Sequence, residues 1–198
     1  MFTKTQARIM QVFASQITER FSIKQISEII NKPYPLVHRT ISDLIKGRFI
    51  YKDKQKYLAL NYRKNHQELA YVENLRTEEF SKRSSDLALF VDDVLERFKE
   101  DFFVFLFFGS IVNKKNTRDI DILFIIPDVK KINITEKILY NVSGNYEQKF
   151  DIHVISFESV YEMLTKREEL NVMNEVLNKH LICYGAETFY RFLQRGRK

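Results

Sequence analysis

Two apolar segments of this chain, each next to residues typical of turns or polar sites, constrain its fold more than any other feature. The first is the run FFVFLFF at 102–108, which Gly109 and Ser110 follow directly. The second is DIDILFII at 119–126. Continuous apolar runs of this length are typical of strands buried on both faces, and a Gly-Ser pair is typical of a tight turn. The sequence therefore predicts two buried strands of one sheet.

The second of these strands begins with two acidic side chains. Residues i and i+2 of a strand project to the same side, so Asp119 and Asp121 should converge. Two carboxylates a few ångströms apart repel by about 1 kcal/mol in water, and by several times more in a less polar medium. Either a bound Mg²⁺ or a nearby basic side chain must offset this repulsion. The basic candidates are Lys114, Lys115 and Arg118.

A third acid strengthens the case for a metal. Asp151 stands at the start of FDIHVISF, whose alternating pattern predicts another strand. On a neighbouring strand its carboxylate would lie beside Asp119 and Asp121. His153 would face the same side, either as a catalytic group or as a hydrogen-bonded surface residue.

Basic residues are concentrated in the first third of the chain. Residues 1–65 contain 13 Lys and Arg against 4 Asp and Glu, whereas residues 66–198 contain 19 against 22. This split indicates that one part of the protein meets a polyanion and that another part does something different. A basic surface that is merely solvated is the alternative.

The basic part has its own pattern of elements. Apolar residues recur at helical spacing over 3–17, and Ser22 is a good cap for a second helix. Pro33 and Pro35 favour the start of a third helix, which Gly47 ends. Two β-prone pieces, FIY and KYLAL, then surround a charged tip. The sequence predicts three helices followed by a hairpin.

Residues 3–61 resemble winged helix-turn-helix DNA-binding domains. The resemblance is carried by FSIKQISEIINKPYPLVHRTISDLIKGRFIYK. In that family the third helix enters the major groove and the wing touches the backbone or the minor groove. Here this implies that Arg39 reads a guanine edge and that wing lysines neutralise phosphates. The implied DNA contacts are Tyr34, His38, Arg39 and Ser42 of the third helix and Lys52, Lys54 and Lys56 of the wing. Winged helices also serve as protein-binding or dimerisation modules, and a homodimer remains open.

The middle segment, 62–98, carries apolar residues at helical intervals. Ser84 and Ser85 mark the one plausible break, where a second helix would be capped. We expect one or two helices that join the two halves. Their apolar stripes are interpreted as core or dimer contacts, with no chemistry assigned.

Residues 99–198 resemble the nucleotidyltransferase superfamily, which includes DNA polymerase beta, kanamycin nucleotidyltransferase and the minimal nucleotidyltransferases. The family pattern is an apolar strand, Gly-Ser, a loop, Asp-x-Asp on a second strand and a third Asp on a later strand. This chain supplies FLFFGS, DIDILFII and FDIHVI in that order. The C-terminal HLICYGAETFYRFL, a short strand, a glycine turn and a helix, is also similar to the ending of small members.

The resemblance implies a role for each residue of the pattern. Gly109 and Ser110 would hold the phosphates of a nucleoside triphosphate. Asp119 and Asp121 would bind two Mg²⁺ ions, and Asp151 would help to bind the catalytic ion and accept the proton of the attacking hydroxyl.

Basic residues of the loop are part of the same implied site. Lys114 and Arg118 would contact nucleotide phosphates. The loop is shorter than is usual in the family, and Arg118 occupies a position that is often small. An inactive relative, in which Arg118 forms an ion pair with Asp119 or Asp121, is the alternative.

These features predict an α/β (α+β) protein with a winged helix at 1–61, a helical linker at 62–98 and a nucleotidyltransferase domain with a mixed sheet at 99–198. The expected function is Mg²⁺-dependent transfer of a nucleoside monophosphate, by default from ATP, to an acceptor that the sequence does not identify. The alternatives are a DNA-binding transcriptional regulator and an antitoxin that acts on a toxin partner or another protein acceptor, each with a degenerate transferase domain.

Composition predicts the compartment. The single Cys183 excludes an internal disulfide and a cysteine-based zinc site. The start MFTKTQARIM lacks the apolar core of a signal peptide, and FFVFLFF is too short to cross a bilayer. We therefore expect a cytoplasmic protein that does not enter membranes.

Overall fold

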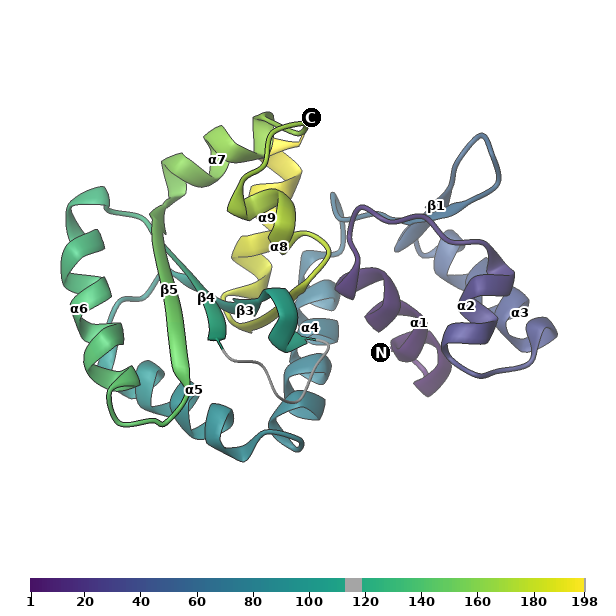
Figure 1. Cartoon of the computed structure of the whole chain (residues 1–198). Coiled ribbons are helices and arrows are strands. Elements are labelled where there is room, and N and C mark those ends of the chain that lie inside the picture. The colour runs from purple at the N-terminus through teal and green to yellow at the C-terminus, as the bar shows by residue number, and fades with distance from the viewer. Residues whose placement is uncertain (113–118, 198) are drawn as a thin grey trace.

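The computed structural model describes residues 1–112 and 119–197. They form an α/β protein in which helices surround a mixed four-stranded sheet (Figure 1). The predicted fold class is confirmed at this level. Helices α1 to α3 and strand β1 lie on one side of α4, and the sheet lies on the other.

Three helices and a hairpin make up the N-terminal part. Their bounds are α1 (Lys4–Ser15), α2 (Ile23–Ile29), α3 (Tyr34–Lys46), β1 (Ile50–Lys52) and β2 (Leu58–Leu60). Thr3 and Ser22 form capping boxes with Gln6 and Gln25, respectively, so the first two helices begin where their side chains satisfy free backbone N–H groups. The two strands pair antiparallel, and Leu58 also bridges to Phe21.

The end of α3 differs in detail from the expectation. Helix α3 does end before Gly47, but Gly47 has φ −73° and keeps a right-handed conformation. The left-handed residue is Arg48, with φ 59°. The side-chain amide of Asn61 donates to the Arg48 carbonyl at 2.8 Å, which fixes this strained position.

The middle segment folds into two helices, α4 (His66–Ser81) and α5 (Ser85–Arg97). The predicted break is confirmed, although the Ser84 side chain forms no capping hydrogen bond. The buried side of α4 is not purely apolar. Leu69 and Val72 are fully buried, and so are the charged side chains of Glu73 and, almost completely, Arg76. The expectation of an apolar stripe without chemistry therefore missed a buried charged pair.

The sheet has the strand order β5-β4-β3-β6. Strand β3 pairs antiparallel with β4 and β6, whereas β4 and β5 are parallel. The bounds are β3 (Val104–Phe108), β4 (Asp119–Ile126), β5 (Lys149–Ser156) and β6 (His180–Tyr184). Each strand falls in a segment whose sequence predicted a strand.

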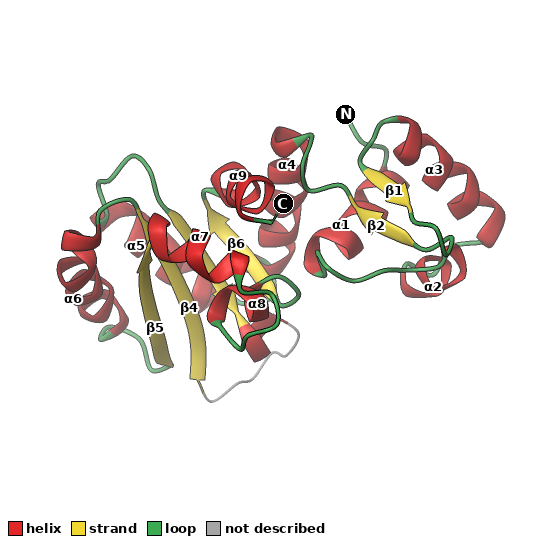
Figure 2. Cartoon of the chain, turned by 90° about the horizontal axis from the view of Figure 1, so that it is seen from above, coloured by secondary structure: helices red, strands yellow, loops and turns green. Residues whose placement is uncertain are grey.

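Helices cover both faces of the sheet (Figure 2). One face packs with α5 and α6 (Ile132–Ser143) through residues such as Phe107 and Ile122. The opposite face, which carries Leu106 and Leu123, packs with α7 (Phe157–Thr165), α8 (Val172–Val176) and α9 (Ala186–Gly196). Short 3₁₀ turns, η1 (Gly109–Val112) and η2 (Val129–Lys131), complete the described elements.

Helix α4 joins the two parts through a shared core. One hydrophobic cluster extends from α1 to α3, through Leu69 and Val72, to the sheet face that carries Leu106. Burying each such side chain stabilises the fold by about 1.5–3 kcal/mol. The segment 62–98 is therefore a packed element, while the division of the chain at 61 and 98 stays a prediction. None of the helices in the described residues is long and apolar enough to span a membrane.

Candidate carboxylate site

The three predicted aspartates lie on the two parallel strands β4 and β5. Asp121 is the direct neighbour of Asp151 in the strand register, and Asp119 is two residues earlier on the same face. The expected placement of Asp151 on a neighbouring strand is thus confirmed. Asp119 and Asp121 are half-buried, whereas Asp151 is exposed. The three side chains therefore share one face of the sheet near the start of β4 and β5.

Gly109 brings the backbone of the η1 turn against Asp121. Strand β3 ends at Phe108, which pairs with Asp121, and Gly109 follows with φ 70°. A Cβ atom at position 109 would collide with the carboxylate oxygen Oδ2 of Asp121. The left-handed conformation favours glycine, and any other residue here would also have to displace the Asp121 carboxylate. Ser110 is the next residue and is exposed.

Asp121 sits in an unfavourable electrostatic environment. Burial raises the pKa of its carboxyl, and the negative charges of Asp151 and Glu175 raise the pKa further. His153 acts in the opposite direction, and Asp119 adds a smaller upward effect. Among the described residues, the charges that act on ionised Asp121 are therefore mainly negative.

Two basic side chains of this region lie against the other two aspartates. Lys149 Nζ lies 3.0 Å from Asp119 Oδ1, and His153 Nε2 lies 3.4 Å from Asp151 Oδ2. Within residues 1–112 and 119–197, no ion pair reaches Asp121. The predicted contacts Lys114 and Arg118, and Lys115 beside them, lie outside the described residues.

Sequence reasoning missed two residues of the site. Lys149 lies opposite Asp119 because β4 and β5 are parallel and in register, and its position two residues before Asp151 was the available signal. Glu175 comes from α8, far along the chain, and no pattern in the sequence connects it to the aspartates.

The aspartates suit a magnesium ion that shares its coordination with a substrate. No group of three or more His, Cys, Asp and Glu side chains in the described residues is arranged to hold a metal ion. Mg²⁺, however, is usually bound by one or two carboxylates together with phosphate oxygens and water. Asp121 and Asp151 supply two neighbouring carboxylates, and burial together with the negative charges of Asp151 and Glu175 raises the pKa of Asp121. These residues therefore fit such an ion.

The predicted DNA-contacting residues of α3 lie on its outer face. Tyr34, His38 and Arg39 are exposed, whereas Ser42 is half-buried. The rings of Tyr34 and His38 are 6.0 Å apart. The Ser42 hydroxyl donates to the His38 carbonyl at 3.0 Å, so its donor is used within the helix.

The hairpin of β1 and β2, the predicted wing, presents three exposed lysines around an ordered tip. Lys52 ends β1, and Lys54 and Lys56 lie in the turn. Asp53 organises this tip by accepting two backbone N–H bonds, and its carboxylate pairs with Arg20 at 2.9 Å. Asp53 was not singled out by sequence reasoning, although an aspartate that starts a turn is a recognisable signal.

Comparisons of the whole chain with protein-family models, with curated proteins and with solved structures gave no match. The described fold and the placement of the aspartates are therefore the observations on which a functional proposal rests.

Proposed function

We propose that the protein is a Mg²⁺-dependent nucleotidyltransferase of the superfamily that its C-terminal part resembles, with an N-terminal winged helix that binds DNA. It would transfer a nucleoside monophosphate from a nucleoside triphosphate, ATP by default, to an acceptor and release pyrophosphate. The observation that carries the proposal is Asp121. It faces Asp151, touches the Gly109 turn and forms no ion pair with a described residue.

The arrangement of the turn supports phosphate binding next to the acids. Gly109 allows the backbone to pass directly over the carboxylate of Asp121. Ser110 is exposed beside it and can donate its hydroxyl to a phosphate oxygen. A triphosphate held there would lie within reach of Asp121 and Asp151.

The residues of the chain have separate tasks in this proposal. Asp119 and Asp121 would hold two Mg²⁺ ions and orient the triphosphate through them, and Asp151 would share the catalytic ion. Asp151, the most exposed of the three, would also take the proton from the attacking hydroxyl. Bound Mg²⁺ would supply charge neutralisation on the phosphates.

The test is nucleotide transfer to unidentified material. The purified protein is incubated with α-labelled nucleoside triphosphates, Mg²⁺ and cell extract, and the labelled product is identified. We expect labelling that falls by about two orders of magnitude or more in Asp121→Asn, because a main electrostatic stabiliser is lost. Asp92→Asn, on the outer side of α5, is the matched control. Equal labelling by Asp121→Asn and the wild type would refute the site.

The DNA-binding part of the proposal is supported by the charge of residues 1–65 and by the exposed residues of α3 and the wing. If about five basic groups contact phosphates, the logarithm of the binding constant should fall with the logarithm of salt with a slope of about −4 to −5. Replacing Lys54 and Lys56 by alanine should reduce the steepness by about 2. A slope near zero would contradict DNA binding.

A second candidate is a DNA-binding regulator or antitoxin whose transferase part no longer catalyses. The observation that favours it is the ion pair between Lys149 and Asp119, in which a lysine neutralises a carboxylate that a metal ion would otherwise bind. Lys149 is largely exposed, with 79% of its side chain accessible, so such a pair is weak and a cation can replace it. Nucleotide binding without pyrophosphate release, unchanged in Lys149→Ala, would favour this second function.

A further inference from the structure

A groove runs between α1 and α4, and none of the three aspartates lines it. Two adjoining cavities form it, and both are lined by Arg8, Gln11 and Glu79. The inner cavity has a volume of about 400 Å³, and the outer one has about 520 Å³. These volumes lie within the range of small-molecule sites. Gln11 and Glu79 are joined by a hydrogen bond of 3.3 Å, which ties the two helices together where the cavities meet.

The inner cavity has a mixed lining, in which apolar side chains stand beside polar and charged ones. Phe80 of α4 contributes an aromatic ring, and Val12, Ile30, Val112 and Leu181 contribute aliphatic side chains. Phe80 is half-buried and leans against Phe107, with ring centroids 5.9 Å apart. Arg83 lies at the rim with 62% of its side chain exposed. A flat, largely apolar group with polar edges would fit this cavity.

The outer cavity is basic. Arg8, Lys4 and Lys32 line it, and Glu79 is its one acidic lining residue among the described residues. All three basic side chains are exposed, and none forms a hydrogen bond or an ion pair with another described residue. Glu79 is already engaged by Gln11 and, at 3.9 Å, by Arg83. The outer cavity therefore has three uncommitted cations for an anionic ligand.

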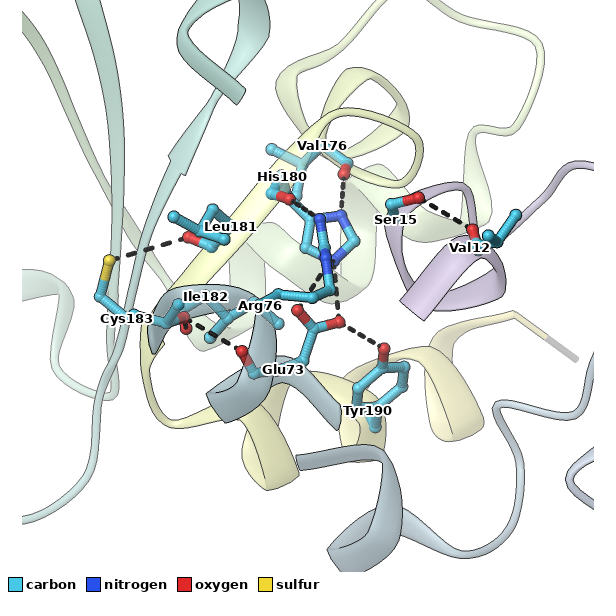
Figure 3. Close-up of polar contacts among 11 residues, drawn as sticks. Val12, Ser15, Glu73, Arg76, Val176, His180, Leu181, Ile182, Cys183 and Tyr190 are labelled. Atoms are coloured by element: carbon cyan, nitrogen blue, oxygen red, sulfur yellow. Dashed lines mark hydrogen bonds and ion pairs between the residues drawn. The ribbon is translucent and has the colours of Figure 1, made fainter. Parts of the chain in front are cut away.

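Arg76 is a basic residue of this region whose side chain is already bonded to other residues of the protein. It reaches the inner cavity, but its guanidinium pairs with Glu73 and donates to the carbonyl of His180 (Figure 3). It is almost fully buried and belongs to the protein interior. Lys4, Arg8 and Lys32 are instead exposed and pair with none of the residues that the structure describes, so they form the candidate ligand-binding set.

We propose that the groove between α1 and α4 binds a nucleoside polyphosphate as a second site, distinct from the aspartates. The base would occupy the inner cavity against Phe80, and the phosphates would lie on Arg8, Lys4 and Lys32. A ligand with a flat, largely apolar group at one end and several negative charges at the other would match the two cavities together. This proposal does not depend on the proposed transfer reaction.

The site would connect the two parts of the protein. Ile29 and Ile30, at the end of α2, line the inner cavity close in sequence to the start of α3 at Tyr34. Val112, on another wall, ends the turn that begins at Gly109. A bound nucleotide would therefore contact both the helix pair that presents α3 and the turn beside Asp121, so it would stabilise one arrangement of the two.

Equilibrium dialysis with labelled ATP in the presence of EDTA tests the proposal, because chelation removes the divalent cations that the aspartate site requires. We expect saturable binding of one ATP by the wild-type protein. Arg8→Ala/Lys32→Ala should weaken it by at least about tenfold, because charge-assisted contacts to phosphate are lost. Both residues are exposed, so this variant should fold. Lys130→Ala/Lys137→Ala, which removes two exposed lysines elsewhere, and Asp121→Asn should bind ATP as the wild type does.

Three results would overturn the proposal. The first is the absence of binding at millimolar ATP. The second is equal affinity in Arg8→Ala/Lys32→Ala and in the wild type, or loss of binding in Asp121→Asn. The third is displacement of labelled ATP by inorganic tripolyphosphate or by polyglutamate at concentrations as low as those at which unlabelled ATP displaces it. These competitors have no base, so the inner cavity would then contribute nothing to binding. Loss of transfer activity alone would bear on the aspartate site and leave this outcome unaffected.

Discussion

Glu73 and Asp121 are two carboxylates that the same protein treats in opposite ways. Glu73 is fully buried between α4, β6 and α9, and Arg76, His180 and Tyr190 all reach it (Figure 3). Burial alone raises the pKa of Glu73, but the Arg76 charge and the contacts of His180 and Tyr190 outweigh it and hold the pKa below its ordinary value. Asp121 is only half-buried, yet its pKa is raised.

The difference shows where the chain supplies its own cation. Around Glu73, the charge is neutralised by the protein, and the cluster acts as part of the core. Around Asp121, the largest charge effects from described residues come from Asp151 and Glu175, which are also negative. A site where the described residues bring like charges together, and where none of them forms an ion pair with Asp121, is suited to an ion and a ligand that arrive from solution.

Removing the Glu73 carboxylate should strongly destabilise the protein. Glu73→Ala leaves the buried Arg76 without its partner, and breaking a buried pair in this way costs about 3–5 kcal/mol. Urea denaturation followed by circular dichroism measures the change in the free energy of unfolding. Glu78→Ala, at an exposed position of the same helix, should change it by less than about 0.5 kcal/mol. A similar small change in both variants would show that Glu73 is not a core charge.

Tyr190→Phe should cost less, because it removes only one hydrogen bond. The hydroxyl of Tyr190 donates to Glu73 Oε1 at 2.7 Å, and hydrogen bonds to charged groups contribute about 1.5–3 kcal/mol. The same denaturation experiment measures the loss, with the exposed Tyr71→Phe as control. If both tyrosine variants unfold at the same urea concentration as the wild type, the hydrogen bond from Tyr190 to Glu73 adds nothing measurable to the stability of the fold.

The Glu73 cluster should also lose its contribution in acid. Because the pKa of Glu73 is lower in the folded protein than the ordinary 4.5, its stabilisation is fully present above that value and is lost as the pH falls through the folded pKa. The stability difference between the wild type and Glu73→Gln should therefore be constant near neutral pH and shrink below about pH 4. Unfolding free energies of both proteins across that range provide the measurement. A difference that grows in acid would mean that the pKa of Glu73 is raised.

Asp121→Asn should have the smallest effect on stability, and in the opposite direction. The variant removes a charge that Asp151, Glu175 and Asp119 repel. We expect the free energy of unfolding without divalent cations to stay constant or to rise by about 1 kcal/mol at most, because solvent screens interactions of partly exposed charges. Thermal unfolding in EDTA gives this value. A loss of several kcal/mol would mean that Asp121 is a structural residue like Glu73.

The aspartate site was largely predictable from sequence because a strand has a short and fixed period. Asp119 and Asp121 had to share a face, and the alternating pattern around Asp151 indicated another strand. The parallel pairing itself was not readable, so the ion pair of Lys149 with Asp119 was missed. Glu175 reaches the site only through the packing of α8, which has no local signal in the sequence.

The Glu73 cluster was missed for a different reason. Glu73 and Arg76 follow Leu69 and Val72 by four residues each and so lie on the same face of α4. Only the apolar members of that face were read as buried, because a charged side chain is rarely buried unless it is paired. The partner that completes the cluster, Tyr190, is on α9 and became visible only in the folded protein.

Binding of Mn²⁺, followed by the loss of the electron paramagnetic resonance signal of the free ion, tests the central contrast most directly. The wild-type protein and Glu73→Gln should both bind Mn²⁺, since the Glu73 carboxylate already has its cation. Asp121→Asn/Asp151→Asn should leave the signal of the free ion unchanged. Equal binding of Mn²⁺ by this double variant and by the wild type would contradict the assignment of the two aspartates as the metal-binding carboxylates.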